Sequence, residues 1–273
     1  MSSENWQALV QKNLGLTATL GKIMLSVKPP INLPDAERLL VASDYSGAHR
    51  GSAYDVYTTL VADASSCAAW LESRAHIRAQ FLSQNRRMSY KALNDGQKRR
   101  ALGPFLAAAD QISGICASFA ISKAAGTIFQ ADDQPHNPEL SECLEWPKPL
   151  FERTFRIVHI VSFFIAGLSR PNQDVLWFSD EDEIAASPKR LIFLTKLWAN
   201  VLSNYAVHSF RHLRCGTTAS DDGSNSIEDL AAIPDLVAGA LSDLLTSVEG
   251  NIRSKIITPF PLNSKPKAAM IGQ

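Results

Sequence analysis

The stretch that most constrains the fold is RLLVASDYSGAHRGSAYDVYTTLVAD, which runs from Arg38 to Asp63. Two runs of apolar, β-branched and aromatic residues flank a glycine-containing turn, so the stretch predicts two paired strands, about 39–46 and 53–62. The first strand is apolar up to Ala42 and then contains Asp44, and the small residues Ser46 and Gly47 follow shortly after it. A carboxylate at the end of a buried strand needs a cationic side chain, a hydrogen-bond donor or a metal ion as its partner. The identity of that partner is the main functional question that the sequence raises.

The remaining pattern predicts an α/β protein with a mixed sheet that helices cover. Further strands are predicted at 113–123, 174–179 and within 207–215. Predicted helices cover 4–27, a helical insertion of about 64–110, about 147–168, a helix from Ser187 onward, and 227–248.

These elements predict three parts of the chain. Residues 1–34 hold the N-terminal helix and a proline-rich linker, residues 35–250 form the main domain, and residues 251–273 form a disordered tail. The helical insertion follows the second strand of the main domain.

The composition is that of an ordinary soluble domain. The chain has 273 residues, of which 45% are hydrophobic, and this is enough to bury a sizeable core. Lys and Arg total 27 and so do Asp and Glu, so the net charge indicates neither a nucleic-acid nor a membrane partner.

Although the whole chain is balanced, the segment from Glu72 to Arg100 is basic, with eight basic and two acidic residues. Such a segment is usually a solvated helix face. In a nuclease, its members Arg86, Arg87 and Lys91 would instead contact the phosphates of a nucleic acid.

Cysteine usage and hydropathy predict a cytoplasmic protein without a membrane partner. The four cysteines are far apart and form no C-x-x-C pair, which is typical of reduced, packed thiols. The start, MSSENWQALVQ, lacks the basic and apolar regions of a signal peptide. The most apolar run, IVHIVSFFIAGL, has twelve residues and is too short to span a bilayer.

Acidic residues follow two predicted strands and sit on the last helix. Asp44 ends the first strand and Asp180 follows the fourth, so both would emerge at the same edge if these strands are parallel neighbours. Asp235 lies in IPDLVAGAL on the closing helix, and Asp182 is either a further ligand or a surface residue. Carboxylates held this close repel one another unless a cation neutralises them, and Mg²⁺ or Mn²⁺ suits hard oxygen ligands.

Three short motifs resemble those of an uncharacterised RNase H-like family. They are the strand VASDYSG with its Asp-x-Ser, the strand-end acids WFSDEDEI, and the helix EDLAAIPDLVAGAL, and together they span roughly residues 38–246. The resemblance implies a five-stranded mixed sheet of order 3-2-1-4-5 flanked by helices. It also implies metal-bound acids that serve nuclease or transposase chemistry.

Carried over by position, the resemblance assigns Asp44, Asp180 and Asp235 as catalytic metal ligands. The superfamily's acid on the helix after the third strand has no clear counterpart, and Glu152 is the nearest candidate. Pro234 stands where the family has alanine, which leaves the orientation of Asp235 open.

Simpler interpretations remain open for each acid. Asp44 could cap the turn or pair with Arg50, and the acidic run could be a solvated loop that caps the next helix. Asp235 could be a helix N-terminal acid after Pro234, and Asp229 is an equally exposed competitor in the same motif.

Three functional hypotheses follow. The first is a two-metal nuclease that acts on DNA or RNA by attack of a metal-activated water. The second is a non-catalytic RNase H-like module that binds a protein partner or a second copy of itself. The third is a hydrolase of small phosphate esters that uses the same acids.

Overall fold

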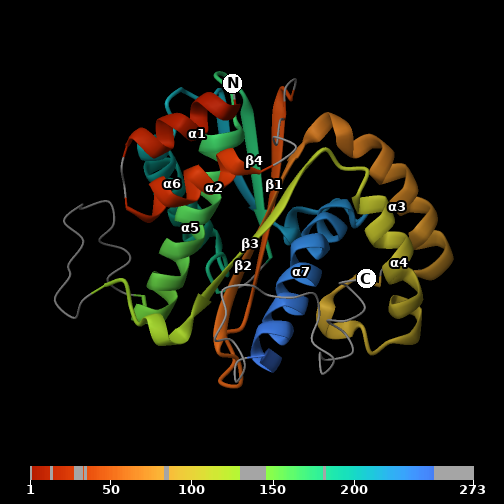
Figure 1. Ribbon diagram of the computed structural model, residues 1–273. Coiled ribbons are helices and arrows are strands. Elements are labelled where there is room, and N and C mark those ends of the chain that lie inside the picture. The colour runs from red at the N-terminus through yellow and green to blue at the C-terminus, as the bar shows by residue number, and fades with distance from the viewer. Residues whose placement is uncertain are drawn as a thin grey trace.

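The structure is a computed structural model that describes residues 2–12, 15–27, 33, 36–82, 86–129, 146–180 and 183–248. It has three layers, with a sheet between two layers of helices (Figure 1). Its strands are β1 Arg38–Ser46, β2 Tyr54–Asp63, β3 Gly114–Ser122, β4 Asp174–Ser179 and β5 His212–Thr217. Its α-helices are α1 Ser2–Gln11, α2 Leu16–Ser26, α3 Cys67–Phe81, α4 Gly96–Ala109, α5 Lys148–Leu168, α6 Pro188–Tyr205 and α7 Ser226–Val248.

The sheet has the order β3-β2-β1-β4-β5. The strand β2 is antiparallel to both β1 and β3, whereas β1, β4 and β5 are parallel to one another. This is the five-stranded mixed sheet that the RNase H-like resemblance implies, and the predicted fold class is confirmed. The helices α3 and α4 lie between β2 and β3, where the helical insertion was predicted.

The turn between β1 and β2 depends on glycine. Gly47 has a φ of +95°, and a Cβ atom there would lie 2.0 Å from the carbonyl oxygen of Tyr54. Only glycine adopts this conformation without steric cost, and only glycine leaves room for the returning strand. The turn thus fixes where β1 ends, directly after Asp44, Tyr45 and Ser46.

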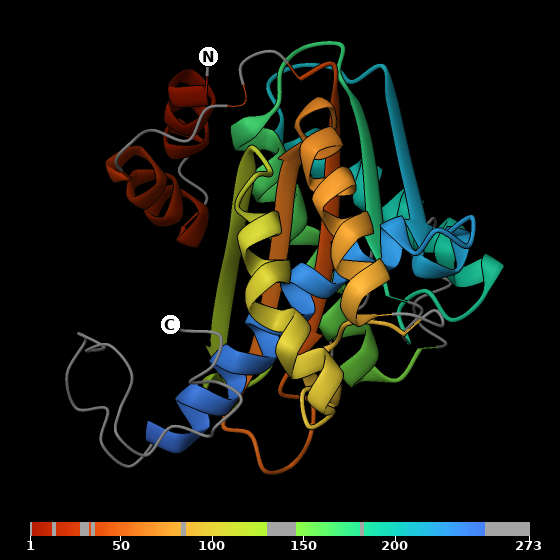
Figure 2. The ribbon, with the colours of Figure 1, turned by 90° about the vertical axis from the view of Figure 1, so that its right-hand side faces the viewer.

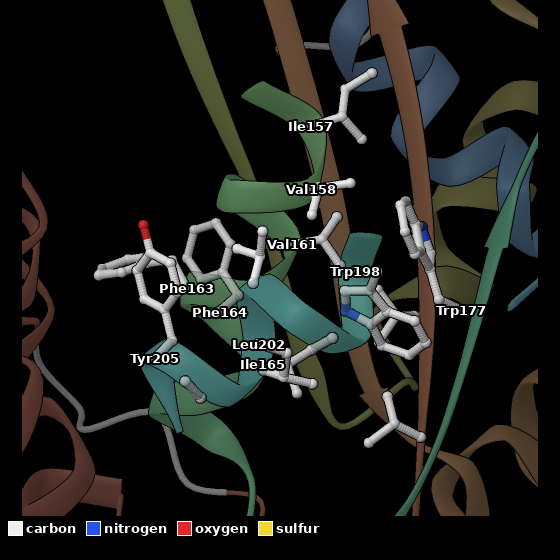
Figure 3. Close-up of a cluster of buried hydrophobic side chains, with 14 of the residues drawn as sticks. Ile157, Val158, Val161, Phe163, Phe164, Ile165, Trp177, Trp198, Leu202 and Tyr205 are labelled. Atoms are coloured by element: carbon white, nitrogen blue, oxygen red, sulfur yellow. The ribbon is translucent and has the colours of Figure 1, made fainter. Parts of the chain in front are cut away.

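The helices α5 and α6 cover one face of the sheet (Figure 1). Their apolar sides meet β4, where the rings of Trp177 and Trp198 pack edge to face with centroids 5.4 Å apart (Figure 3). Both rings are fully buried. Aromatic pairs in this arrangement stabilise a core beyond the area that they bury, so this contact holds β4 in place beneath α6.

The helix α7 packs against β1 and β2 on the other face, with α3 and α4 beyond it (Figures 1 and 2). It is the one described helix long and apolar enough to cross a membrane, and 56% of its most apolar window is buried inside the protein. Packing against the sheet accounts for this composition. The helix also runs unbroken through Pro234, so Asp235 does not stand at a helix N-terminus and that interpretation was wrong.

The N-terminal segment differs from the single helix predicted over 4–27. It forms two helices, because Gly15 adopts a φ of +50° just before α2 and ends helical geometry there. The helix α1 packs on α5, where the ring of Trp6 lies against Gly167 and takes the space of a side chain. Trp6 and Leu9 therefore belong to the same core as the sheet.

Two further predictions need comment. The fifth strand begins at His212, five residues later than the start of the predicted stretch 207–215, because residues 207–211 form bends and irregular chain. The predicted tail 251–273 and Asp182 lie outside the described residues.

Candidate functional site

The end of β1 directs Asp44 away from the core that α5 and α6 cover. Successive side chains of a strand point to opposite faces. Ser43 accepts a hydrogen bond from Trp177 Nε1 at 2.8 Å and contacts the Tyr45 hydroxyl at 2.6 Å. Asp44 lies between these two residues and points to the face that carries α7.

The predicted neighbourhood of β1 and β4 is confirmed. The two strands are parallel neighbours in a register that pairs Ser43 with Ser179. Asp44 follows Ser43 on β1 and Asp180 comes directly after the end of β4, so both emerge at the same end of these parallel strands. The Thr218 hydroxyl, which follows β5, donates a hydrogen bond of 2.9 Å to Asp180 Oδ1.

A cavity of about 410 Å³ opens at this edge. Side chains from the end of β1, α5, α7 and residues 87–91 before α4 line it, together with Asp180 directly after β4 and Thr218 directly after β5. Its charged residues are Asp44, Asp180, Glu228 and Asp235 on the acidic side, and Arg87, Lys91 and Arg153 on the basic side.

The helix α7 contributes Glu228 and Asp235 from one face, since seven residues span about two turns. Gly239 lies one turn further along, and a Cβ atom there would come within 2.3 Å of the Tyr90 ring. The missing side chain lets the segment around Tyr90 approach α7. As a result, the Tyr90 backbone N–H donates a hydrogen bond of 2.6 Å to Asp235 Oδ2.

The acids of the cavity repel one another. Burial raises the pKa of Asp235, the Tyr90 N–H and Lys91 oppose that rise, and the charge of Asp180 adds to it. Burial also raises the pKa of Glu228, which Arg87 opposes and Asp180 again reinforces. Asp180 therefore lies close enough to both acids of α7 to disfavour their ionisation.

A buried ion-pair network anchors the basic wall of the cavity. Asp229 is fully buried and accepts hydrogen bonds from Arg74 at 2.6 Å and from Arg78 at 2.8 Å. Arg78 also donates to the backbone carbonyl of Arg86 at 3.2 Å, which ties down the segment that carries Arg87 and Lys91. The expectation that Asp229 is exposed was wrong, because these two guanidinium groups neutralise it inside the protein.

The predicted site residues fall into three groups. Asp44, Asp180 and Asp235 line the cavity together with Arg87 and Lys91.

Two predicted residues lie elsewhere. Arg86 pairs with Asp95 at 3.2 Å on the surface. Glu152 pairs with Arg156 and lines a neighbouring cavity of about 470 Å³. The third group is Asp182, which lies outside the described residues.

Three lining residues were missed by sequence reasoning. The seven-residue spacing from Asp235 was a usable signal for Glu228. The predicted strand order also carried a signal for Thr218, because β5 neighbours β4 and Ser179 pairs with Thr217. Arg153 had no such signal, since it reaches the cavity from the opposite helical layer.

The donor chemistry of the cavity fits a divalent cation, because carboxylate oxygens are the ligands that Mg²⁺ and Mn²⁺ prefer. Such an ion would also relieve the repulsion between Asp180 and Asp235. In the part of the chain that the structure describes, however, no three His, Cys, Asp or Glu side chains lie close enough to hold one ion together. Binding by three of these acids would thus require them to move closer.

Comparisons with known proteins add little. No protein-family model matches the chain, and no curated protein does. Among solved structures, ribonuclease H2 from Pyrococcus horikoshii OT3 is similar over 84% of this chain and 82% of that one, with 12% identity and a TM-score of 0.37. A similarity this low does not assign the fold, and the fold assignment depends on the strand order and directions.

Proposed function

We propose that this protein is a divalent-metal-dependent nuclease that hydrolyses phosphodiester bonds in the cavity at the ends of β1 and β4. The observation that carries the proposal is the meeting of Asp44, Asp180 and Asp235, which come from three separate elements, in one cavity. Residues at the carboxyl ends of parallel strands are where open α/β sheets place their chemistry.

Asp44, Asp180 and Asp235 would hold Mg²⁺ or Mn²⁺, and Glu228 borders the same space. When bound, such ions activate a water molecule for attack on phosphorus and stabilise the leaving oxygen. The protein's own part is to fix the carboxylates. The Thr218 hydroxyl orients Asp180 and the Tyr90 N–H orients Asp235.

The basic wall supplies contacts for the phosphates of DNA or RNA. Arg87, Lys91 and Arg153 line the cavity together with the acids. Arg87 pairs with Glu228 at 2.5 Å while most of its side chain remains exposed, so it can exchange this partner for a phosphate. Arg153 lies over the Tyr45 ring, with its guanidinium carbon 5.5 Å from the ring centre.

The direct test is cleavage of labelled DNA and RNA with Mn²⁺ or Mg²⁺ present. We expect wild-type protein to cleave and the variants Asp44→Asn and Asp180→Asn to lose at least about 100-fold in rate, because each removes a ligand charge. Glu72→Gln, an exposed acid on α3, is the matched control and should retain full activity. Equal cleavage in excess chelator would exclude the metal mechanism.

A non-catalytic module is the second candidate, and the cations of the cavity favour it. Lys91 and Arg87 already offset the charges of Asp235 and Glu228, so these acids have protein partners without a metal ion. A module of this kind would bind a protein partner or a second copy of itself and show no cleavage under any metal condition. Competition by small phosphate esters against oligonucleotides would separate a third candidate, a small-ester hydrolase, from the nuclease.

A further inference from the structure

The two outermost strands of the sheet, β3 and β5, differ in how they resist pairing with another chain. At one edge, β5 has six residues, among them His212 and Arg214. At the other edge, β3 has nine residues, GICASFAIS, with no charged residue and no proline. Charges, prolines and short length are the usual protections of an edge strand. The strand β3 therefore has none of these three protections, whereas β5 has two.

The outer edge of β3 is open in the part of the chain that the structure describes. There β3 pairs with β2 alone. None of its nine residues is buried, in contrast to β1 and β2, whose middle residues are. Figure 2 shows β3 at the margin of the sheet, on the side where the N-terminal helices lie. Its backbone N–H and C=O groups on that side are a template for a further strand.

An apolar groove runs beside this edge. It measures about 440 Å³, and α2, β3 and α5 line it with residues that include Leu20, Phe119 and Phe155. Its rim carries Leu16, which is 71% exposed, and Ile128, which is 52% exposed. Exposed apolar residues that gather in one place, rather than singly, mark a surface for association.

The helix α2 extends this surface. Besides Leu16, its side chains Ile23 and Leu25 are exposed by 53% and 39%. The same region thus combines a projecting apolar helix, an apolar groove and an unpaired strand edge. A surface that joins a projection to a recess can fit a copy of itself, as a two-fold interface requires.

We propose that β3 and α2 form the interface with a second copy of this chain. The two β3 strands pair antiparallel about a two-fold axis at Ser118, the middle of the strand, and join both sheets into one. Around that axis Cys116 faces Ala120 of the other copy and Gly114 faces Ser122, so no like charges meet. Both α2 helices lie on the same face of the joined sheet, where their exposed side chains cover the seam.

Sedimentation velocity over a range of protein concentrations tests the proposal, with Ala120→Lys as the first variant. Wild-type protein should sediment as a dimer. Ala120→Lys should sediment as a monomer, because it puts a lysine, one of the usual protections of an edge strand, into the seam at a residue that is exposed in the single chain. Ile23→Glu on α2 should also give monomers, and since Ile23 is exposed this change leaves the folded chain intact.

The matched control is Ile192→Glu, which changes a residue 58% exposed on α6 and should leave the dimer unaffected. The proposal is overturned if wild-type protein is monomeric throughout the range. It is equally overturned if a dimer forms that Ala120→Lys and Ile23→Glu leave intact. Neither result bears on the nuclease proposal, because the interface is distinct from the acidic cavity.

Discussion

Asp229 and Asp235 lie six residues apart on α7 and have opposite surroundings. Asp229 is fully buried between Arg74 and Arg78, which satisfy its charge. Asp235 faces the cavity and the like charge of Asp180. Two guanidinium groups neutralise the first residue inside the protein, whereas burial and the charge of Asp180 raise the pKa of the second, which is common at functional sites.

Asp229→Ala should lower the free energy of unfolding by about 3–5 kcal/mol, because it leaves two buried guanidinium groups without their partner. Urea unfolding measures the change. Arg86→Ala is the control, since it breaks only the surface pair with Asp95 and should cost less than about 1 kcal/mol. Equal losses in the two variants would contradict this view of the network.

Asp235→Asn should make the protein more stable than wild type at neutral pH. Because the pKa of Asp235 is raised in the folded state, the folded protein binds that proton more tightly, and its stability falls as pH rises through the raised pKa. Asparagine does not titrate and its oxygen can still accept the Tyr90 N–H. Thermal unfolding of wild type and Asp235→Asn from about pH 4 to pH 8 measures this difference. The two melting temperatures should converge at the acid end.

Asp95 provides a control of opposite sign. The backbone N–H of Lys98 at the start of α4 lowers its pKa, so Asp95→Asn should be less stable than wild type at neutral pH and equal to it in acid. If Asp235→Asn and Asp95→Asn changed stability at neutral pH in the same direction, the surroundings of each carboxylate would not determine that change.

At the scale of elements, the glycine of the α7 motif has a packing role. Gly239 leaves the space that the Tyr90 ring fills, and this contact sets the position of the segment that carries Lys91. The motif LVAGAL thus explains how α7 and the segment before α4 come together.

Gly239→Ala should lower stability by about 1–3 kcal/mol and weaken any metal or nucleic-acid binding, because the added methyl group displaces the Tyr90 ring. Gly103→Ala is the matched control within α4. No atom lies within 4 Å of a Cβ there, so alanine should stabilise that helix by about 0.5–1 kcal/mol. Thermal unfolding compares the two, and stabilisation by both would show that the Tyr90 contact is dispensable.

Strands and helices were largely predictable from the sequence, and the reasons are local. Apolar, β-branched and aromatic runs on both sides of a glycine turn mark β1 and β2, and Ser187 caps α6 through the Arg190 N–H. The break at Gly15 was missed because residues on both sides of it favour helix. The start of β5 was missed because Val207 and Phe210 suit a strand by type but lie in an irregular segment.

The pairing of distant residues was less predictable. Arg74 and Asp229 are 155 residues apart, and nothing in the local pattern links them. The meeting of Asp44 and Asp180 could be predicted only because the strand order placed β1 beside β4. Glu152 was chosen by analogy of position, without a geometric reason, and it lies in a different cavity.

At the scale of the whole molecule, the sheet order brings β1 beside β4, and α7 crosses them so that its acids reach the same edge. The cavity is therefore a product of the topology rather than of any one motif. The edge strand β3 lies apart from this cavity and is where we propose that a second copy pairs. The cytoplasmic location remains a prediction of the sequence.

The most direct measurement of the central claim is the melting temperature with and without Mn²⁺. An ion that binds only the folded chain raises the midpoint by mass action. We predict a rise for wild-type protein and for Glu72→Gln, and a much smaller one for Asp44→Asn and Asp180→Asn. No rise in wild type at millimolar Mn²⁺, or an equal rise in all four proteins, would contradict a shared metal site at the ends of β1 and β4.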